Sequence, residues 1–171
     1  MIALRSILHN LAVIAVGFVV ALVGVTLDRL FAIGEFRSIF AAVFGSLFIC
    51  IGFLIRLWAT CLFYKNNMKV IVTAPQRTLL TSGPFRYSRN PLYLGGNVLI
   101  FFGAGLVLGS PAALVITALH LPFIDLFIRR EERQLEQRFG DEWVRYRRSV
   151  RGGFEQYVCF SQIRDVAISF R

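Results

Sequence analysis

The sequence predicts an all-α integral membrane protein, a bundle of about four transmembrane helices with a further C-terminal helix at the membrane surface. Of the 171 residues, 56% are hydrophobic and only 17% are charged, and the mean hydropathy is +0.63. These values lie far from those of soluble domains. Long stretches carry no charge, and a turn signal divides the longest of them. Because the chain is too short for two ordinary domains, we expect one domain over residues 1–171.

The first two transmembrane helices are assigned from apolar stretches of about 20 residues or more, the length that crosses the hydrocarbon core. They are expected over 7–27 and 38–64, and the second contains a single charge, Arg56. Together they form the first part of the domain, residues 1–64.

The third and fourth helices come from one uncharged stretch, residues 91–124, which is too long for a single span. Gly, Ser and Pro at 109–111 are a turn signal near its middle. We therefore expect helices over 92–108 and 112–128, joined by a tight hairpin.

Basic residues predict the orientation of the bundle. They follow the second and fourth helices, whereas the other two loops are balanced or uncharged. Under the positive-inside rule, both termini and both basic segments face the cytoplasm. The net charge of +9 and the pI near 10.3 then reflect this topology and attraction to anionic membrane lipids, without nucleic acid as a partner. We expect a multi-pass protein of the bacterial inner membrane or the endoplasmic reticulum membrane.

The segment between the second and third helices, residues 69–91, is expected to form an ordered loop or a small hairpin. It leads into 83–95, where two prolines, two arginines and two tyrosines gather. Asn90 is a good helix N-cap and Pro91 suits a first helical position, so the third helix should begin here. A helix start beside arginines can hold a carboxylate or a phosphate. An anchor against lipid headgroups is an alternative of equal weight.

The fourth helix carries a carboxylate on its apolar face. Glu131 lies at helical spacing with four apolar residues, namely Leu121, Ile124, Ile128 and Leu135. A carboxylate facing a packed bundle is costly unless it meets a cation, so we expect Arg86, Arg89 or a cationic ligand as its partner.

A second polar face of this helix is expected to form salt bridges along the helix near the lipid headgroups. Its members are Asp125, Arg129, Glu132 and Glu136. Arg56 is expected either to extend its guanidinium to the interface or to pair with a carboxylate such as Asp125.

After the fourth helix ends near Phe139 and Gly140, Asp141 should cap a short amphipathic helix that carries Trp143 and Tyr146. This pattern favours packing on the membrane surface over a lid above a site. Residues 154–171 form a tail without a clear signal. Phosphate-binding glycine loops, zinc-spaced His/Cys sets and serine nucleophile motifs are missing from the sequence, so no metal is expected.

Two separated motifs resemble those of the isoprenylcysteine carboxyl methyltransferases and the related phospholipid methyltransferases. The first is Gly-Pro-aromatic-Arg-Tyr-x-Arg-His-Pro-x-Tyr-x-Gly, matched by residues 83–95 with Asn90 in place of His. The second is Glu-Glu-x-x-Leu followed by Phe-Gly and Tyr, matched by Glu131, Glu132, Leu135, Phe139, Gly140 and Tyr146. The likeness covers residues 81–150, and Arg56-Leu57-Trp58 resembles an Arg-x-Trp found in the second helix of such proteins.

The resemblance implies a membrane methyltransferase that binds S-adenosylmethionine on the cytoplasmic side, in a pocket formed within residues 65–153 and without a Rossmann sheet. It also implies a lipophilic small-molecule or lipidated substrate that enters from the bilayer. The cofactor carries a carboxylate, an ammonium and a sulfonium. A basic helix start, a carboxylate such as Glu131 or Glu132, and aromatic rings suit these three groups.

The resemblance assigns roles to individual residues. The expected catalytic residues are Arg89, Asn90 and Glu131. The expected cofactor-binding residues are Tyr87, Arg89, Asn90, Pro91, Tyr93, Gly95, Glu131, Glu132 and Phe139, and the expected substrate-binding residues are Arg56, Trp58, Arg86 and Tyr146. Asn90 can hydrogen-bond a cofactor but cannot be protonated as the usual His can.

Three alternatives remain at this stage. Within the methyltransferases, the acceptor is a prenylcysteine-like carboxylate, another lipid or a phospholipid amine. A steroid-reductase-like enzyme would require NADPH, and a non-enzymatic scaffold or lipid-binding protein would use the Arg and Tyr segments only as membrane anchors. The oligomeric state is open.

Overall fold

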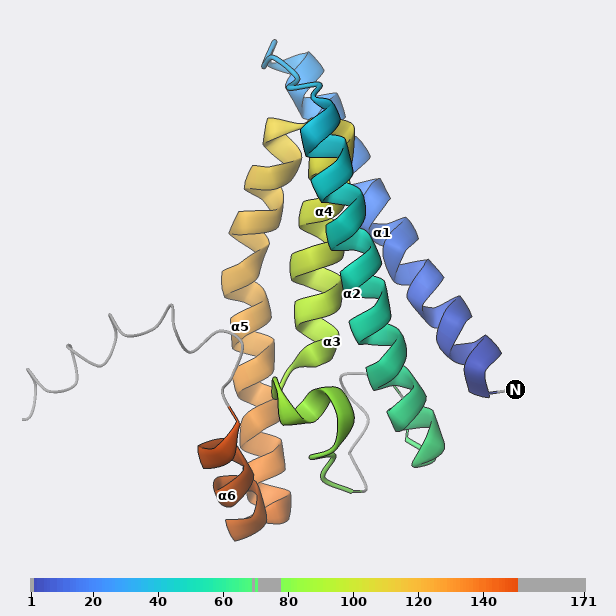
Figure 1. The fold of residues 1–171 in the computed structure, drawn as a ribbon. Coiled ribbons are helices and arrows are strands. Elements are labelled where there is room, and N and C mark those ends of the chain that lie inside the picture. Colours follow the sequence, from blue (N-terminus) through green and yellow to red (C-terminus); the bar gives the residue numbers. More distant parts are fainter. Residues whose placement is uncertain (1, 69, 71–77, 151–171) are drawn as a thin grey trace, which may run out of the picture.

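The computed structural model describes residues 2–68, 70 and 78–150, and within this part of the chain all regular secondary structure is helical. Helices α1 and α2 run antiparallel to each other. The chain then returns through α3, η2 and α4 along α2, and α5 runs back in the opposite direction beside α4 (Figure 1). The elements are α1 (Ile2–Leu30), α2 (Ile39–Lys65), η1 (Gly83–Arg86), α3 (Pro91–Tyr93), η2 (Leu94–Ile100), α4 (Phe101–Leu108), α5 (Pro111–Phe139) and α6 (Asp141–Ser149).

Within the described residues, four helical stretches are long and apolar enough to cross a membrane, which confirms the expected all-helical membrane bundle. They are Ile2–Leu30, Ile39–Lys65, Pro91–Leu108 and Pro111–Phe139. The third comprises α3, η2 and α4 in sequence. The helices extend beyond several expected boundaries, because charged residues at the ends of an apolar segment do not stop a helix from continuing.

The 69–91 segment is only partly described. Residues 71–77, where a hairpin would turn, lie outside the described residues, as does the expected tail at 154–171. Residues 78–82 form neither helix nor strand, and the single 3-10 turn η1 follows them.

The turn between α4 and α5 confirms the predicted hairpin. Gly109 adopts a left-handed conformation with φ +64°, which ends α4. Ser110 caps α5 by accepting a hydrogen bond from Ala113 N (3.1 Å), and Pro111 is the first helical residue. Asp28 of α1 is fully buried here and accepts hydrogen bonds from Ser110 Oγ and from Ala112 N. We call this end of the bundle the hairpin end.

Glycines allow α2 to approach the third span closely. A Cβ atom on Gly52 would lie 2.4 Å from the Gly95 carbonyl oxygen, and a Cβ on Gly95 would lie 2.7 Å from the Gly52 carbonyl oxygen. Gly95 belongs to η2, a π-helix, which widens the third span at this contact. Close backbone contact through small residues is a common way for membrane helices to associate.

Gly52→Ala is therefore expected to destabilise the protein by about 1–3 kcal/mol, because the new methyl group meets backbone that cannot move aside. Gly34→Ala is the control, since a Cβ there meets no atom within 4 Å. Thermal unfolding of both variants in the same detergent measures the difference. Equal melting temperatures for the two variants would contradict this packing.

The other end of the bundle contains an aromatic core between α2, η1 and α6. Its buried members include Phe63, Phe85, Trp143 and Tyr146, with Leu135 and Phe139 packed against them. Trp143 is only 1% exposed. The prediction that the aromatic face of this helix contacts lipid is therefore wrong, because that face packs inward against η1. The position of the helix near the membrane surface stays a prediction. We call this end of the bundle the α6 end; α6 lies beside the lower part of α5 in Figure 1.

The start of α6 also differs from the sequence-based prediction. Gly140, with φ +50°, ends α5 and at the same time caps α6, and Asp141 is the first residue of the helix instead of its cap. Because α5 and α6 share this single junction residue, the chain changes direction sharply, and α6 packs on the aromatic core.

Candidate functional site

The start of α3 is where the sequence predicts it, but its capping is different. Asn90 precedes the helix and Pro91 is its first residue, yet the Asn90 side chain makes no capping hydrogen bond. Its Nδ2 instead lies 3.5 Å from Glu132 Oε1 on α5, and its backbone N donates to Ser88 Oγ at 3.2 Å. The Asn90 amide thus faces a carboxylate on a neighbouring helix.

Arg89 and Glu132 form an ion pair between the segment before α3 and α5. Arg89 Nη1 lies 3.5 Å from Glu132 Oε1, and the two side chains are 0% and 15% exposed. This contact differs from the prediction that Glu132 forms a salt bridge along its own helix near the lipid headgroups. Asp125 and Arg129 do form such a bridge, at 2.6 Å. Glu132 turns inward because the segment before α3 places the buried guanidinium of Arg89 next to it.

Among the described residues, neither arginine that the sequence offers as a partner for Glu131 pairs with it, and the cationic ligand that the sequence also allows stays a prediction. Arg89 pairs with Glu132, and Arg86 is exposed on η1. The half-buried Glu131 carboxylate instead lies next to the Tyr93 hydroxyl group, near enough for electrostatic interaction. That hydroxyl is buried and interacts with Glu131 both electrostatically and as a side-chain hydrogen-bond partner. A carboxylate and a buried hydroxyl therefore face each other at the junction of α3 and α5.

Arg56 is buried, at 6% exposure, and does not pair with Asp125 as expected. Its guanidinium donates from Nε to Asn10 Oδ1 (2.9 Å) and from Nη1 to the Leu92 carbonyl (2.6 Å). Its Nη2 lies 3.3 Å from His9 Nε2. Arg56 thus joins α1 and α2 to the first turn of α3.

Tyr146 of α6 holds η1 in place. Its hydroxyl donates a 2.8 Å hydrogen bond to the Phe85 carbonyl. Burial raises the pKa of this phenol to about 12, with Arg89 acting in the opposite direction and Glu132 in the same direction. The phenol is therefore protonated at neutral pH and available as a donor.

Tyr146→Phe is expected to lower stability by about 1 kcal/mol, because the Phe85 carbonyl loses its donor. A phenol pKa raised on folding stabilises the protein fully below pH 10, and this contribution is lost as the pH rises towards about 12. The difference in melting temperature between wild type and Tyr146→Phe should therefore shrink between these two values. A difference that is constant or grows over this range would count against the assignment.

Other residues with predicted roles lie apart from the Glu131–Tyr93 contact. Tyr87 is 78% exposed, and Trp58 and Arg86 are also exposed. Pro91 is buried, Gly95 packs against α2, and Phe139 packs on the aromatic core. The structure brings together Arg89, Asn90, Tyr93, Glu131 and Glu132, with Arg56 and Tyr146 beside them.

Sequence reasoning missed the contribution of α1. Asn10 is fully buried and donates to Ser6 O (2.8 Å) and to Thr60 Oγ1 (2.9 Å) in addition to accepting from Arg56. A signal was present, since Ser6 and Asn10 are polar residues four apart in an apolar helix, and Thr60 follows Arg56 at the same spacing. Such spacing places polar groups on one face of a helix.

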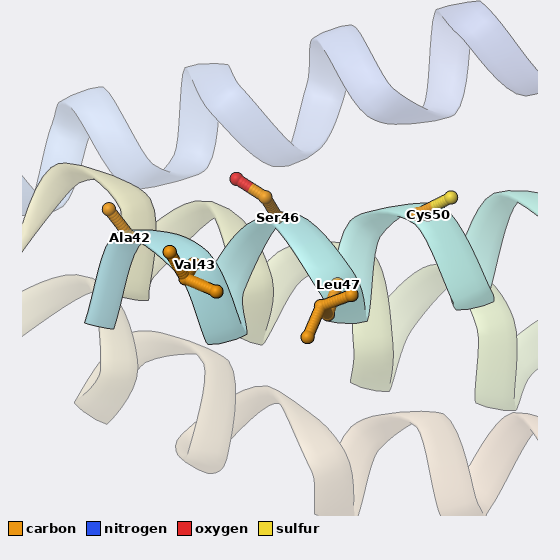
Figure 2. A pocket seen from close by; sticks show the side chains of 5 residues that line it. All are labelled: Ala42, Val43, Ser46, Leu47 and Cys50. Carbon is orange, nitrogen blue, oxygen red and sulfur yellow. The ribbon is translucent and has the colours of Figure 1, made fainter. Parts of the chain in front are cut away.

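A shallow apolar depression lies elsewhere, along the outward side of α2 towards the hairpin end. It is lined by Ala42, Val43, Ser46, Leu47 and Cys50, which lie along that helix in Figure 2. None of these residues carries a charge or belongs to the polar cluster. The depression is therefore separate from the candidate site.

The fold and the cluster define a helical membrane protein with a mixed-charge site at one end of its bundle. The chain matches the phospholipid methyltransferase family over residues 40–142, more than half of its length, and it belongs to that family. It is thus a membrane methyltransferase, and the family implies S-adenosylmethionine as the methyl donor. Searches of curated proteins and of solved structures gave no match.

Proposed function

We propose that the protein transfers a methyl group from S-adenosylmethionine to a lipophilic acceptor at the α6 end of the bundle, and that this end faces the cytoplasm. The observation that carries this proposal is the mixed cluster at the junction of α3 and α5. There Arg89 and Glu132 form a buried ion pair, and Glu131 lies against the Tyr93 hydroxyl.

The chemistry of the cluster fits the donor. When bound, S-adenosylmethionine supplies an electrophilic methyl group on a sulfonium, together with an ammonium and a carboxylate. Glu131 would hold a cationic group, because a half-buried carboxylate gains most from a cation that replaces lost hydration. The Tyr93 hydroxyl, which lies against Glu131, can in addition accept a hydrogen bond from a ligand. Arg89 and the Asn90 amide would hold the anionic end.

The cytoplasmic orientation is supported by the charge of this end. Exposed basic side chains lie at the end of α2, on η1 and along the last turns of α5 and α6; they are Lys65, Arg86, Arg129, Arg130, Arg133, Arg138, Arg145, Arg147 and Arg148. The α4–α5 turn at the hairpin end has none. Basic loops remain on the cytoplasmic side during insertion.

The acceptor would be a nucleophile carried by a long apolar group, either a prenylcysteine-like carboxylate or another lipid, with a phospholipid amine as the alternative. A carboxylate needs only alignment and exclusion of water. An amine must also lose a proton, and the Asn90 amide cannot accept it, so this task would fall to Glu131 or Glu132.

Transfer of labelled methyl from S-adenosylmethionine tests the proposal. The full chain in lipid nanodiscs is supplied separately with phosphatidylethanolamine and with a farnesylated cysteine derivative. Matched acceptors without the nucleophile, phosphatidylcholine and the farnesylcysteine methyl ester, serve as controls. We expect label in one nucleophilic acceptor and none in its control. Labelling of neither acceptor, although the donor binds, would contradict a lipophilic acceptor of these classes.

A further inference from the structure

We infer that α1 is a working part of the methyltransferase site, because Asn10 on α1 orients Arg56, and Arg56 in turn fixes the turn of α3 that carries Tyr93. Arg56 is then a positioning residue. The functional part of this inference depends on the proposed binding of S-adenosylmethionine at Tyr93 and Glu131. Helix α1 lies outside the segment that matches the family, residues 40–142.

The contact on the α1 side has a fixed orientation. The Asn10 amide is fully buried and uses both of its ends, since Oδ1 accepts from Arg56 Nε and Nδ2 donates to Ser6 O and Thr60 Oγ1. Thr60 Oγ1 in turn donates to the Leu57 carbonyl at 3.1 Å. Rotating the amide would break all of these bonds at once, so Asn10 holds the Arg56 Nε edge in one direction.

The contact on the α3 side is equally specific. Arg56 Nη1 donates to the carbonyl of Leu92, the residue directly before Tyr93. The guanidinium also fits closely against Gly96, where a Cβ atom would lie 2.6 Å from Nη1. Arg56 therefore contacts both the first turn of the third span and the π-helix that follows it, and Tyr93 lies between these two contacts.

The hydrogen-bond partners of Arg56 indicate that it positions α3 and does not simply neutralise a carboxylate. The groups that hydrogen-bond Arg56, namely Asn10 Oδ1, Leu92 O and His9 Nε2, are neutral acceptors from α1 and α3. Burial of a cation among neutral groups is costly, so an apolar residue would be the better choice for stability alone. The planar guanidinium, unlike the ammonium of lysine, donates in several fixed directions at once.

The link reaches the candidate site through Tyr93. Arg56 and Tyr93 are close enough to interact electrostatically, and Tyr93 interacts in the same way with Glu131 on α5. A shift of the Leu92 carbonyl would move the Tyr93 backbone and displace its hydroxyl from Glu131. Loss of Asn10 or of Arg56 should thus be detected at Tyr93 although Asn10 lies on a different helix.

The test combines two measurements on the full chain in nanodiscs. Tyrosines are replaced by 3-fluorotyrosine, and the Tyr93 fluorine resonance is assigned with Tyr93→Phe. Binding of S-adenosylmethionine is measured by calorimetry. The variants are Arg56→Gln, Arg56→Lys and Asn10→Leu. The matched control is Asp28→Asn, which weakens another buried polar contact of α1, at the hairpin end.

We expect the Tyr93 resonance to move in all three variants while that of the exposed Tyr87 stays in place. Affinity for S-adenosylmethionine should fall on the order of tenfold in Arg56→Gln, within the usual range for coupled sites. Arg56→Lys should show a smaller loss. Asp28→Asn should lower the melting temperature without either change.

An unchanged Tyr93 resonance in Arg56→Lys and Asn10→Leu would overturn the inference, even if Arg56→Gln fails to fold. Equal loss of affinity in Asp28→Asn would also overturn it, because the effect would then follow general loosening of the bundle. If the wild type does not bind S-adenosylmethionine, the proposed function fails, and the fluorine measurement still decides whether α1 positions Tyr93.

Discussion

Replacing Arg89 with methionine is expected to lower the stability of the protein by about 3–5 kcal/mol, the usual cost of removing one partner from a buried ion pair. The Arg89 side chain is 0% exposed, and Glu132 lies 3.5 Å away at 15% exposure. Without Arg89, a largely desolvated carboxylate loses a cationic partner. Chemical or thermal unfolding in detergent measures the change.

Two further variants show whether the pair is the cause. Arg89→Met combined with Glu132→Gln should recover part of the stability, since the second change removes the carboxylate that has lost its Arg89 partner. Arg129→Met should cost at most about 1 kcal/mol, because the Arg129 side chain is 45% exposed and its ion pair with Asp125 is only half-buried. If Arg89→Met is as mild as Arg129→Met, the ion pair does not organise this end of the bundle.

Replacing Glu131 with glutamine is expected to affect binding and stability in opposite directions. Binding of S-adenosylmethionine should weaken roughly tenfold to a hundredfold, as for loss of a hydrogen bond to a charged group. Stability should remain equal or rise, because the variant removes a half-buried charge. Calorimetry and thermal unfolding on the same preparation measure both effects.

Glu136→Gln is the matched control, since Glu136 is an exposed carboxylate of the same helix. It should change neither quantity appreciably. If both variants bind the donor with wild-type affinity, Glu131 is not part of the cofactor site. If Glu131→Gln loses stability and binding together, Glu131 acts as a structural residue.

The membrane bundle could be predicted from the sequence because its signals are local. The turn at Gly109 and Ser110 requires only a residue that tolerates positive φ, a side-chain cap and a following proline. By contrast, the burial of Trp143 depends on η1, which comes from a segment some 60 residues earlier in the chain. The same amphipathic pattern is compatible with a membrane surface or with a protein core, and only the fold decides between them.

The residues of the candidate site could be predicted from the sequence, but the contacts between them could not. The helical spacing shows that Glu131 lies on the apolar face, and the neighbouring motif supplies arginines. Arg89 pairs with Glu132 and not with Glu131. This choice depends on how the segment before α3 packs against α5. Arg56 was identified as unusual, but its partner Asn10 is 46 residues away on another helix. No local pattern specifies such a contact.

Calorimetric titration of the solubilised full chain with S-adenosylmethionine and, separately, with NADPH tests the central claim most directly. Our account predicts saturable binding of S-adenosylmethionine, weakened in Glu131→Gln and retained in Glu136→Gln, and no binding of NADPH. Binding of NADPH alone would contradict a methyl-donor site and favour a reductase. Binding of neither would contradict a cofactor site at the α3–α5 junction.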